Sequence, residues 1–419
     1  EGVSAVVFDE FHERSLSGDL SLGRVLDLQE GPRPDMAVAV MSATLEISGL
    51  RDYMGASCRV LEAHGRQYPV ETVYRAPRLV SDGRGRVAPP PVWEQAADAV
   101  KECGDVLVFM PGVYEIRKTA ELLAGRPWMG GRDVFPLYGA LTPEQQNRAV
   151  EQGKNPRVIV STNVAETSLT IEGVRTVIDS GLVRRSGWDP YRGMDTLHLT
   201  KISKASAAQR AGRAGRVAPG RCFRLWSEAE QARKADFDPP ECFRVDLAGA
   251  VLNLAAWGVT APEGFRWLDA PDPLVMQRAV NLLAALGATE ADGSLTDVGR
   301  RMTAFPLPPR LARLMAAGQD EQCVVELAAI AALMQGEGVA MKGGLNDNLR
   351  DSADYTDFQA EWRAVEKAVD AGFEAGACTR WGISARGARE VWMAYRQLLS
   401  IGSRGKSREM PEPDFTAAR

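Results

Sequence analysis

Apolar positions near the start of the chain alternate between short continuous runs and helical spacing. Residues 3–8 and 36–41 are apolar runs of the kind that form strands buried on both faces of a sheet. Between these runs, Leu22, Val25 and Leu26 keep the spacing of one helix face. A strand, a helix and a second strand with short joints predict a parallel sheet.

The same alternation returns between residues 92 and 228. Three apolar runs predict strands, at residues 106–109, 157–160 and 176–179. Ile116, Ala120 and Leu123 mark a helix, and turn signals within residues 182–200 predict a hairpin. This stretch therefore predicts a second, complete α/β lobe, and the connection to it is expected at residues 65–70.

The pattern changes after about residue 229. Leu247, Val251 and Leu254 form one helical stripe, and a second stripe runs from Val275 to Leu286. A tight turn at Asp292-Gly293 follows, so two helices and a small hairpin predict a winged-helix module. From Pro309 onward the spacing is helical, with a polar joint at residues 345–357.

Composition limits the classes of protein that these elements can belong to. A chain of 419 residues with 45% hydrophobic and 25% charged residues is typical of soluble proteins with several domains. No apolar run is long enough to cross a membrane, and no secretory leader is present, so a membrane partner is not expected. Because residue 1 already lies in a strand pattern, we interpret the sequence as a fragment.

Cysteine and histidine content argues against a metal cluster or a disulfide framework. The six cysteines are far apart, without a CxxC pair, and there are only three histidines. A reducing cytoplasm is the expected compartment.

The net charge of −5 argues against nucleic-acid binding by the whole surface. Between Thr196 and Ser227, however, there are seven Lys and Arg residues and no Asp or Glu, which favours either a solvated face or a local anion site.

Two polar sites follow the predicted strands of the first lobe. Asp9 and Glu10 come directly after the first strand, where ligands bind in parallel sheets. Adjacent carboxylates suit Mg²⁺ and can orient a water molecule, although such a pair more often caps a helix. Residues 42–44, Ser-Ala-Thr, end the next strand. Alone they predict a turn, but their hydroxyls would lie beside the first pair.

Two further polar sites follow strands of the second lobe. Residues 161–171 carry seven polar side chains, which suit phosphate and sugar ligands or a capped loop. In residues 209–216, Arg210, Arg213 and Arg216 recur every three residues with small residues between them. On a helix this spacing places the guanidinium groups on roughly one face, and Gly212 and Gly215 allow close approach. We therefore expect phosphate binding by this segment.

Together these segments resemble the superfamily 2 helicases of the DEAH-box group. Residues 9–12 (DEFH) resemble motif II, and the other resemblances are residues 42–44 to motif III, 109–112 to motif IV, 161–171 to motif V and 209–216 to motif VI. The order and spacing of these segments agree with the family pattern, and the resemblance covers essentially the whole chain. Phe11 in motif II, Pro111 in motif IV and residues 268–271 (LDAP) resemble the bacterial HrpB-type branch.

The resemblance implies an α/β fold of two RecA-like parallel-sheet lobes, the first incomplete, followed by a winged-helix domain and a helical bundle. The expected boundaries are residues 1–64 for the rest of the first lobe, 65–228 for the second lobe, 229–303 for the winged helix and 304–419 for a truncated, ratchet-like helical domain.

The resemblance also implies roles at an ATP site. Asp9 and Glu10 would hold Mg²⁺, and Glu10 would be the general base. His12 would link this site to Gln209, which helps to position the attacking water. Arg213 and Arg216 would reach the γ-phosphate as arginine fingers, which contribute about 10³–10⁵ in rate in related reactions.

Binding roles are implied at other positions. The residues expected at the nucleotide are Ser42, Thr44, Thr170 and Glu172. Gly112, Thr162 and Asn163 fall where the family contacts the RNA backbone, and the hairpin at about 182–200 would act as a wedge. Contacts to sugar and phosphate imply single-stranded RNA with little sequence preference. Val150 stands where many relatives carry an aromatic residue that stacks on adenine.

One motif of the family is missing from the sequence. No GxxxxGK[ST] occurs in the 419 residues, so we expect the P-loop lysine and hydroxyl residue to lie before residue 1. The expected activity is ATP-dependent RNA unwinding by the parent protein, with negligible hydrolysis by the fragment. The alternatives are a DNA-directed helicase and a nucleic-acid-binding or scaffold protein without ATPase activity.

Overall fold

The computed structural model describes most of the chain in two compact units. The described residues are 2–43, 47–63, 68–81, 87–101, 103–166, 169, 171–189, 193–336, 338–352, 354, 356–403, 413 and 415. Unit 1 comprises Glu1–Val245 with Trp267–Asp269, and unit 2 comprises Asp246–Arg266 with Ala270–Arg419. The four-domain division expected from the sequence stays a prediction.

Unit 1 begins with a strand–helix–strand element, as predicted. Strands β1 (Ala5–Phe8) and β2 (Ala37–Val40) pair in parallel, in register from Ala5 with Ala37 to Phe8 with Val40. Helix α1 (Leu16–Glu30) joins them; the Ser15 side chain accepts a hydrogen bond from the Gly18 amide at its start. Helix α2 (Ile47–Met54) follows β2.

The prediction that β1 and β2 are buried on both faces is wrong for the described residues. Each strand alternates exposed and half-buried positions, and Val7 is 56% exposed. Phe8 and Val40 pack toward a cluster formed by Phe11, Leu22 and Leu26, so α1 covers one face. Among the described residues this sheet has two strands, and its other face has no helix packed on it.

The second lobe contains a six-stranded sheet among the described residues, and every pairing is parallel. In order across the sheet the strands are β3 (Val70–Tyr74), β12 (Gly220–Arg224), β9 (Thr176–Asp179), β6 (Val106–Phe109), β8 (Arg157–Ser161) and β7 (Asp133–Leu137). The three predicted strands β6, β8 and β9 form its centre. The pattern did not predict β3, β7 or β12, and Pro136 is tolerated because β7 is an edge strand.

Alternate strand residues pack against helices on opposite faces of this sheet. Val106 and Val108 contact the cluster that includes α3 (Val92–Val100) and α4 (Val113–Ala124). Leu107 and Phe109 contact the cluster that includes α5 (Pro143–Val150) and α6 (Lys204–Gly212). This period of two explains why the central strands read as continuous apolar runs.

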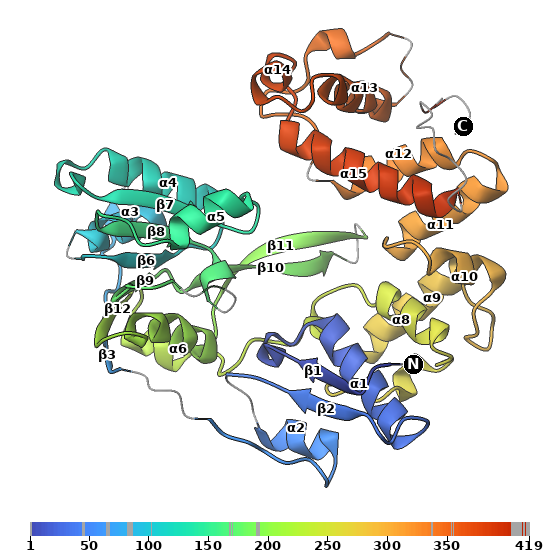
Figure 1. Ribbon diagram of the computed structural model, residues 1–419, viewed down its shortest axis with the longest axis horizontal. Helices are drawn as coiled ribbons and strands as arrows, with labels where there is room; N and C mark the ends of the chain where they lie inside the picture. The colour runs from blue at the N-terminus through green and yellow to red at the C-terminus, as the bar shows by residue number, and fades with distance from the viewer. Residues whose placement is uncertain are drawn as a thin grey trace. The chain divides into compact units, whose positions relative to one another are not determined.

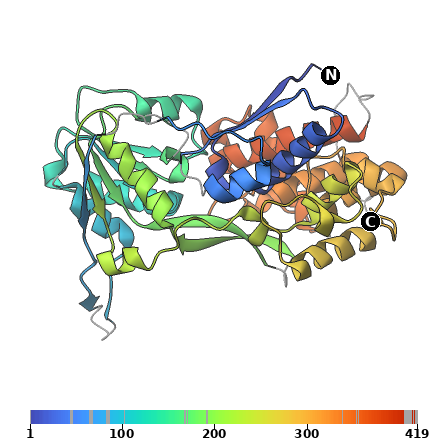
Figure 2. The ribbon, with the colours of Figure 1, turned by 90° about the horizontal axis from the view of Figure 1, so that it is seen from below.

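A long hairpin leaves this lobe where the sequence predicted one. Strands β10 (Leu182–Asp189) and β11 (Met194–Lys201) pair antiparallel, and Figures 1 and 2 show the green hairpin extending away from the six-stranded sheet. Met194, Leu197 and Leu199 on β11 are all more than half exposed. A shorter pair, β4 (Val80–Ser81) with β5 (Val87–Ala88), precedes α3.

Unit 2 is helical apart from small turns, as predicted for this part of the chain. Its helices are α8 (Ala248–Ala256), α9 (Pro273–Ala285), α10 (Asp297–Met302), α11 (Pro309–Asp320), α12 (Val324–Gln335), α13 (Asp357–Asp370), α14 (Ala375–Arg380) and α15 (Ala385–Gly402). A bridge between Thr289 and Leu295 closes the predicted turn, with Gly293 at φ +82°. Figure 1 shows α15 alongside α12. Within the described residues no helix suits a membrane crossing.

Candidate functional site

The Asp9–His12 turn is fastened to the ends of both first-lobe strands. The Phe11 amide donates to the Met41 carbonyl at 3.1 Å, and the Met41 amide donates to the Phe8 carbonyl at 2.7 Å. Glu10 is left-handed, at φ 49°, and Asp9 Oδ1 accepts the Glu10 amide at 2.8 Å. The short helix η1 (Phe11–Glu13) has no side-chain cap. The two carboxylates therefore do not serve as a helix cap.

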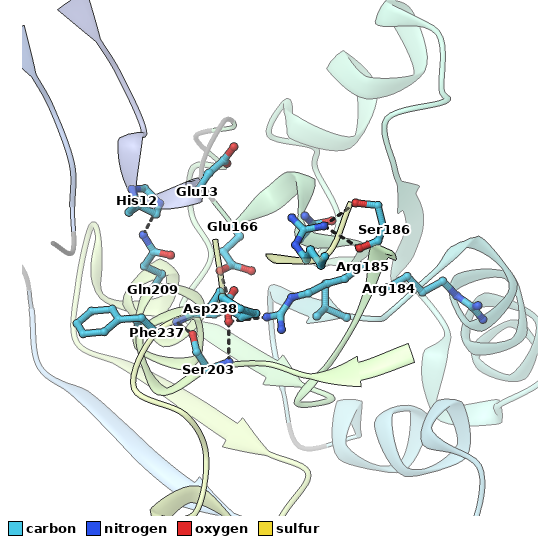
Figure 3. Close-up of a pocket in the computed structure, with 16 residues that line it drawn as sticks. His12, Glu13, Glu166, Arg184, Arg185, Ser186, Ser203, Gln209, Phe237 and Asp238 are labelled. Atoms are coloured by element: carbon cyan, nitrogen blue, oxygen red, sulfur yellow. Dashed lines mark hydrogen bonds and ion pairs between the residues drawn. The ribbon is translucent and has the colours of Figure 1, made fainter. Parts of the chain in front are cut away.

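His12 joins this turn to the second lobe. Its Nε2 lies 2.8 Å from Gln209 Nε2, across 197 positions of sequence, and its Nδ1 lies 3.4 Å from Glu10 Oε2. Figure 3 shows His12 and Gln209 facing each other across this contact. The structure thus brings together the two residues that the family resemblance paired, and the Glu10 carboxylate lies beside the other nitrogen of the imidazole ring.

The three arginines of residues 209–216 do not share one helix face, which corrects the geometry expected from their spacing. Helix α6 ends at Gly212, and a 3-10 turn, η4 (Arg213–Gly215), takes its place. Arg210 is 1% exposed and points into its own lobe, whereas Arg216, beyond the turn, is exposed. The change of helix type redirects the later side chains.

Arg210 is held by carboxylates of its own lobe. Its Nε donates to Glu166 Oε2 at 2.8 Å and its Nη1 to Asp179 Oδ1 at 3.0 Å, and the guanidinium lies 4.9 Å from the centre of the Phe109 ring. Burial alone would lower the pKa of Arg210, but the two carboxylates outweigh it and raise the pKa. Arg210 is therefore a structural cation, which agrees with its place outside the expected catalytic set.

Arg213 and Arg216 lie in the electrostatic field of Glu10. Burial, and then repulsion by Arg216, lower the pKa of Arg213 to about 10, while the Glu10 charge acts in the opposite direction. Burial also lowers the pKa of Arg216, again opposed by Glu10. Two partly desolvated cations that repel each other form a place where a polyanion would relieve their repulsion.

Close packing at Gly215 positions this turn. A Cβ there would lie 2.5 Å from the Tyr68 carbonyl oxygen, and the Tyr68 amide donates to the Gly215 carbonyl at 2.9 Å. A Cβ on Gly212 would meet no atom within 4 Å. Close approach of another backbone is thus observed at Gly215, whereas the space beside Gly212, at the end of the helix, is open and close approach there stays a prediction.

The loop after β8 is held by buried arginines. Arg213 Nη1 donates to the Leu169 carbonyl at 2.5 Å and its Nη2 to the Glu166 carbonyl. At the other end of the loop, Arg157, 2% exposed, donates to the Glu172 carbonyl at 2.7 Å. These bonds hold the carbonyl groups of residues 166, 169 and 172, while the Glu172 side chain remains exposed.

The other expected binding residues have different surroundings. The Thr162 hydroxyl accepts the Val164 amide, and Asn163 is exposed at the start of η3 (Asn163–Ala165). Ser42 directly follows Met41, which holds the Asp9–His12 turn. Thr44 and Thr170 lie outside the described residues.

Gly112 is buried beneath an arginine of the hairpin. A Cβ on Gly112 would lie 2.6 Å from Arg184 Nε, and Arg184 itself pairs with Glu115 at 2.9 Å. The sugar-phosphate backbone of a bound RNA would reach Gly112 only if Arg184 moved. The expected RNA contact at Gly112 stays a prediction.

A polar cavity of about 300 Å³ lies beside the His12–Gln209 contact. Figure 3 shows its lining side chains, which come from residues 12–13, the loop after β8, strand β10, helix α6 with its N-cap and the segment before unit 2. They include Glu13, Asn163, Arg185, Ser186, Asp238 and Arg244. The sequence analysis did not single out the last four residues, because the pairs they form are distant in sequence.

Asp9 and Glu10 fit a Mg²⁺ ion that keeps most of its water ligands. Neither carboxylate caps the turn that follows, and Asp9 is exposed. Among the described residues no group of three or more His, Cys, Asp or Glu is arranged around a metal position. Mg²⁺ is commonly bound by one or two carboxylates together with substrate phosphates.

Comparison with known proteins gives matches to helicases over both units. Residues 93–218 match the model of the helicase conserved C-terminal domain, and residues 279–307 match that of the winged-helix helicase-associated domain HA2. The ATP-dependent RNA helicase HrpB of Escherichia coli is 38% identical over 348 residues, which are 80% of this chain and 41% of that protein. The pre-mRNA-splicing factor ATP-dependent RNA helicase prp22 of Schizosaccharomyces pombe is 36% identical over 79% of this chain and 28% of its own.

A solved structure agrees with the sequence comparison. The crystal structure of the E. coli DExH-box NTPase HrpB superimposes with a TM-score of 0.76 and 32% identity, over 100% of this chain and 46% of that one. The chain spans less than half the length of the curated relatives that it matches. The matched domains, the relatives and the fold agree with the motifs: the chain belongs to the DEAH-box helicases, of the HrpB type.

Proposed function

We propose that the protein couples ATP hydrolysis to movement along single-stranded RNA and to strand separation. The observation that carries this proposal is the His12–Gln209 contact at 2.8 Å, which joins the two lobes and leaves Glu10 close enough to Arg213 and Arg216 to oppose the lowering of their pKa values. These groups come from different lobes, and carboxylates opposite guanidinium groups are the parts that phosphoryl transfer requires.

In this proposal each side chain has one task. Glu10 accepts the proton of the attacking water, and Gln209 helps to orient that water. Asp9, together with Glu10, holds Mg²⁺ through its water shell; when bound, Mg²⁺ neutralises charge on the phosphate oxygens. Arg213 and Arg216 stabilise the charge that develops on the transferred phosphoryl group.

Further residues bind the two substrates. The proposed nucleotide contacts are Ser42, Thr44, Thr170 and Glu172. Gly112, Thr162 and Asn163 are the proposed contacts to the nucleic-acid backbone. RNA is the proposed substrate because the relatives are named RNA helicases. Backbone contacts alone do not exclude DNA, which stays the alternative substrate.

A reducing cytoplasm is the proposed compartment. All six cysteines lie among the described residues without a disulfide bond, and five of them are buried. Free buried cysteines are usual in proteins of reducing compartments.

The test is RNA-stimulated ATP hydrolysis by the protein at its complete natural length. Glu10→Gln removes the base, and we expect turnover to fall by on the order of 10²–10⁴-fold. Arg213→Ala removes a proposed arginine finger. Arg213→Lys keeps the positive charge but loses the paired bonds to the loop carbonyls, so it separates the effect of the charge from the effect of those contacts. Arg221→Gln is the matched control, because Arg221 pairs with Glu71 at the exposed end of β12. Undiminished turnover in the Glu10 and Arg213 variants would exclude the assignment.

The remaining alternative is a nucleic-acid-binding or scaffold protein without ATPase activity. The absence of GxxxxGK[ST] from these 419 residues motivates it. Sequencing the coding region upstream of Glu1 separates the two. A strand, a P-loop and a helix there would support the enzyme, and a start codon at residue 1 would support the alternative. Competition between matched RNA and DNA strands at one salt concentration decides the substrate.

A further inference from the structure

Residues 241–244 contact both the Asp9–His12 region and the hairpin. They include the short helix η5 (Glu241–Phe243) and are followed by Val245, the last residue of unit 1 before α8 begins in unit 2. The family motifs do not include this segment. Its contacts form a continuous path between two places that the proposed function must move together.

Glu241 holds the exit of the turn that carries His12. The Glu241 amide donates to the Arg14 carbonyl at 3.0 Å, and Glu241 Oε2 accepts the amide of Leu16, the first residue of α1, at 2.8 Å. Arg14 lies two positions after His12 and is left-handed, at φ 49°. One carboxylate and one amide of Glu241 thus fix the point where the turn becomes α1.

Arg244 holds the hairpin. Its Nη1 donates to the Ser186 carbonyl at 2.8 Å and to the Ser186 hydroxyl at 2.5 Å, and its Nη2 lies 3.5 Å from Glu241 Oε1. Ser186 lies in the middle of β10, opposite Leu197 of β11. The dashed lines at Ser186 in Figure 3 mark these two bonds. Arg244 and Glu241 are each about one quarter exposed, so water only partly screens the pair.

A neighbouring contact fixes the same part of the hairpin. Arg185 pairs with Asp238, whose Oδ1 also accepts the Ser203 amide at 3.1 Å. Two consecutive residues of β10 are therefore tied to residues 238–244. The polar cavity of about 300 Å³ lies between these contacts and His12, so the path runs along its wall.

We infer that Arg244 is a positioning residue that, through Glu241, couples the Asp9–His12 turn to the β10–β11 hairpin. The inference rests on the proposed function for its consequence: a displacement of the turn during the nucleotide cycle moves the hairpin against the nucleic acid. Arg244 touches neither the proposed nucleotide site nor the reacting atoms. Its loss therefore separates ATP turnover from strand separation.

The first experiment measures base pairs unwound per ATP hydrolysed by the complete protein. Arg244→Gln should leave the RNA-stimulated turnover within about twofold and lower the unwinding yield by about 2- to 30-fold, the range of coupling networks. Arg244→Lys retains a charged donor and should give an intermediate yield. Arg233→Gln is the matched control, because Arg233 is exposed and bonds a carbonyl of its own helix.

The second experiment measures hydrogen exchange without nucleotide or RNA. Arg244→Gln should increase exchange at residues 182–201 relative to residues 106–109 of β6. Among the described residues, Glu241 itself makes no bond to the hairpin and reaches it only through Arg244. Glu241→Gln should nevertheless increase hydrogen exchange at residues 182–201. The double variant should add little to either single variant.

The two experiments distinguish failure of this inference from failure of the proposed function. If the natural protein does not unwind RNA, the proposed function fails, and hydrogen exchange alone decides the coupling. Unchanged hairpin exchange in the Glu241→Gln variant would overturn the inference. An Arg244→Gln protein in which turnover and unwinding fall in parallel would overturn it as well, because that result indicates a general structural defect.

Discussion

The Nε2 of His12 and the Nε2 of Gln209 lie 2.8 Å apart, although the two residues are separated by 197 positions and belong to different lobes. A hydrogen bond at this distance requires one group to donate and the other to accept, so the tautomer of His12 and the orientation of the Gln209 amide are linked. The Oε2 of Glu10 lies 3.4 Å from Nδ1 of His12, so the Glu10 carboxylate is the third group in this interaction.

This contact predicts a double-variant result. His12→Ala and Gln209→Ala should each lower RNA-stimulated ATP turnover, and the double variant should be little worse than the more damaged single variant. The coupling energy should be about 0.5–3 kcal/mol, as for residues in direct contact. Steady-state hydrolysis with and without RNA provides the measurement. Additive losses would show that the two residues act independently.

Arg210 and Arg216 should respond in opposite ways to substitution. Arg210→Ala leaves Asp179, which is fully buried, without its cation, and breaking such a pair costs about 3–5 kcal/mol. Arg216 is exposed, so Arg216→Ala should change stability by less than about 1 kcal/mol while greatly reducing ATP turnover. Thermal unfolding and hydrolysis, measured on both variants, check this contrast. Equal melting temperatures would contradict it.

Two residues that resemble the HrpB-type branch meet in space. Phe11 and Leu268 belong to one apolar cluster, and Arg14 bonds both Asp19 and Asp269. Asp269→Asn should therefore lower the melting temperature. Leu268→Ala, at a half-buried position, should lower the free energy of unfolding by up to about 2 kcal/mol and so lower the melting temperature further. Asp272→Asn is a suitable control, because Asp272 caps the exposed start of α9. No difference from this control would contradict the prediction.

Cys222 predicts a pH dependence. Burial and the nearby Asp179 raise the pKa of its thiol from 9.0 to about 12. The unfolded chain loses this proton first, so the contribution to stability is complete below pH 9 and declines between pH 9 and about 12. In the native protein Cys222 should resist alkylation at pH 8.5 and react after unfolding. Peptide mapping after alkylation checks this, and rapid native labelling of Cys222 would contradict it.

The 419-residue chain by itself should bind single strands weakly but hydrolyse ATP negligibly. The second lobe and its hairpin are present, whereas a P-loop sequence is not. Binding should weaken as salt rises, because backbone contacts release counterions. Fluorescence anisotropy at two salt concentrations and a phosphate-release assay measure these properties. Hydrolysis at the rate of a full-length relative would contradict the prediction.

The sequence predicted the elements whose signal is local. Strand β6 occupies the predicted residues, and the β10–β11 hairpin follows its turn signals, because apolar runs and turn chemistry depend on neighbouring residues. Strand β3 was missed because three of its five residues are polar or aromatic, at the edge of the sheet. The exposed face of β1 was also missed, since burial depends on which strands lie beside it.

The candidate site was predicted through its motifs, but not through its supporting contacts. Asp9 and Glu10 were found because they follow an apolar strand pattern, whereas His12 and Gln209 were assigned through the resemblance to the helicase motifs. The burial of Arg210 depends on Glu166, in the loop after β8, and on Asp179, the last residue of β9. The Arg244–Ser186 contact joins residues 58 positions apart without any periodic pattern. Such pairs become visible only in three dimensions.

The central claim is that a nucleotide lies between Glu10 and the guanidinium groups of Arg213 and Arg216. Its most direct test is a crystal structure of the complete protein with Mg²⁺ and ADP–aluminium fluoride, which mimics the transferred phosphoryl group. The account predicts the fluoride within hydrogen-bonding distance of both guanidinium groups, with Glu10 beside the water in line. A nucleotide bound elsewhere, with Arg213 still on the carbonyls of Glu166 and Leu169 and Arg216 turned away, would contradict it.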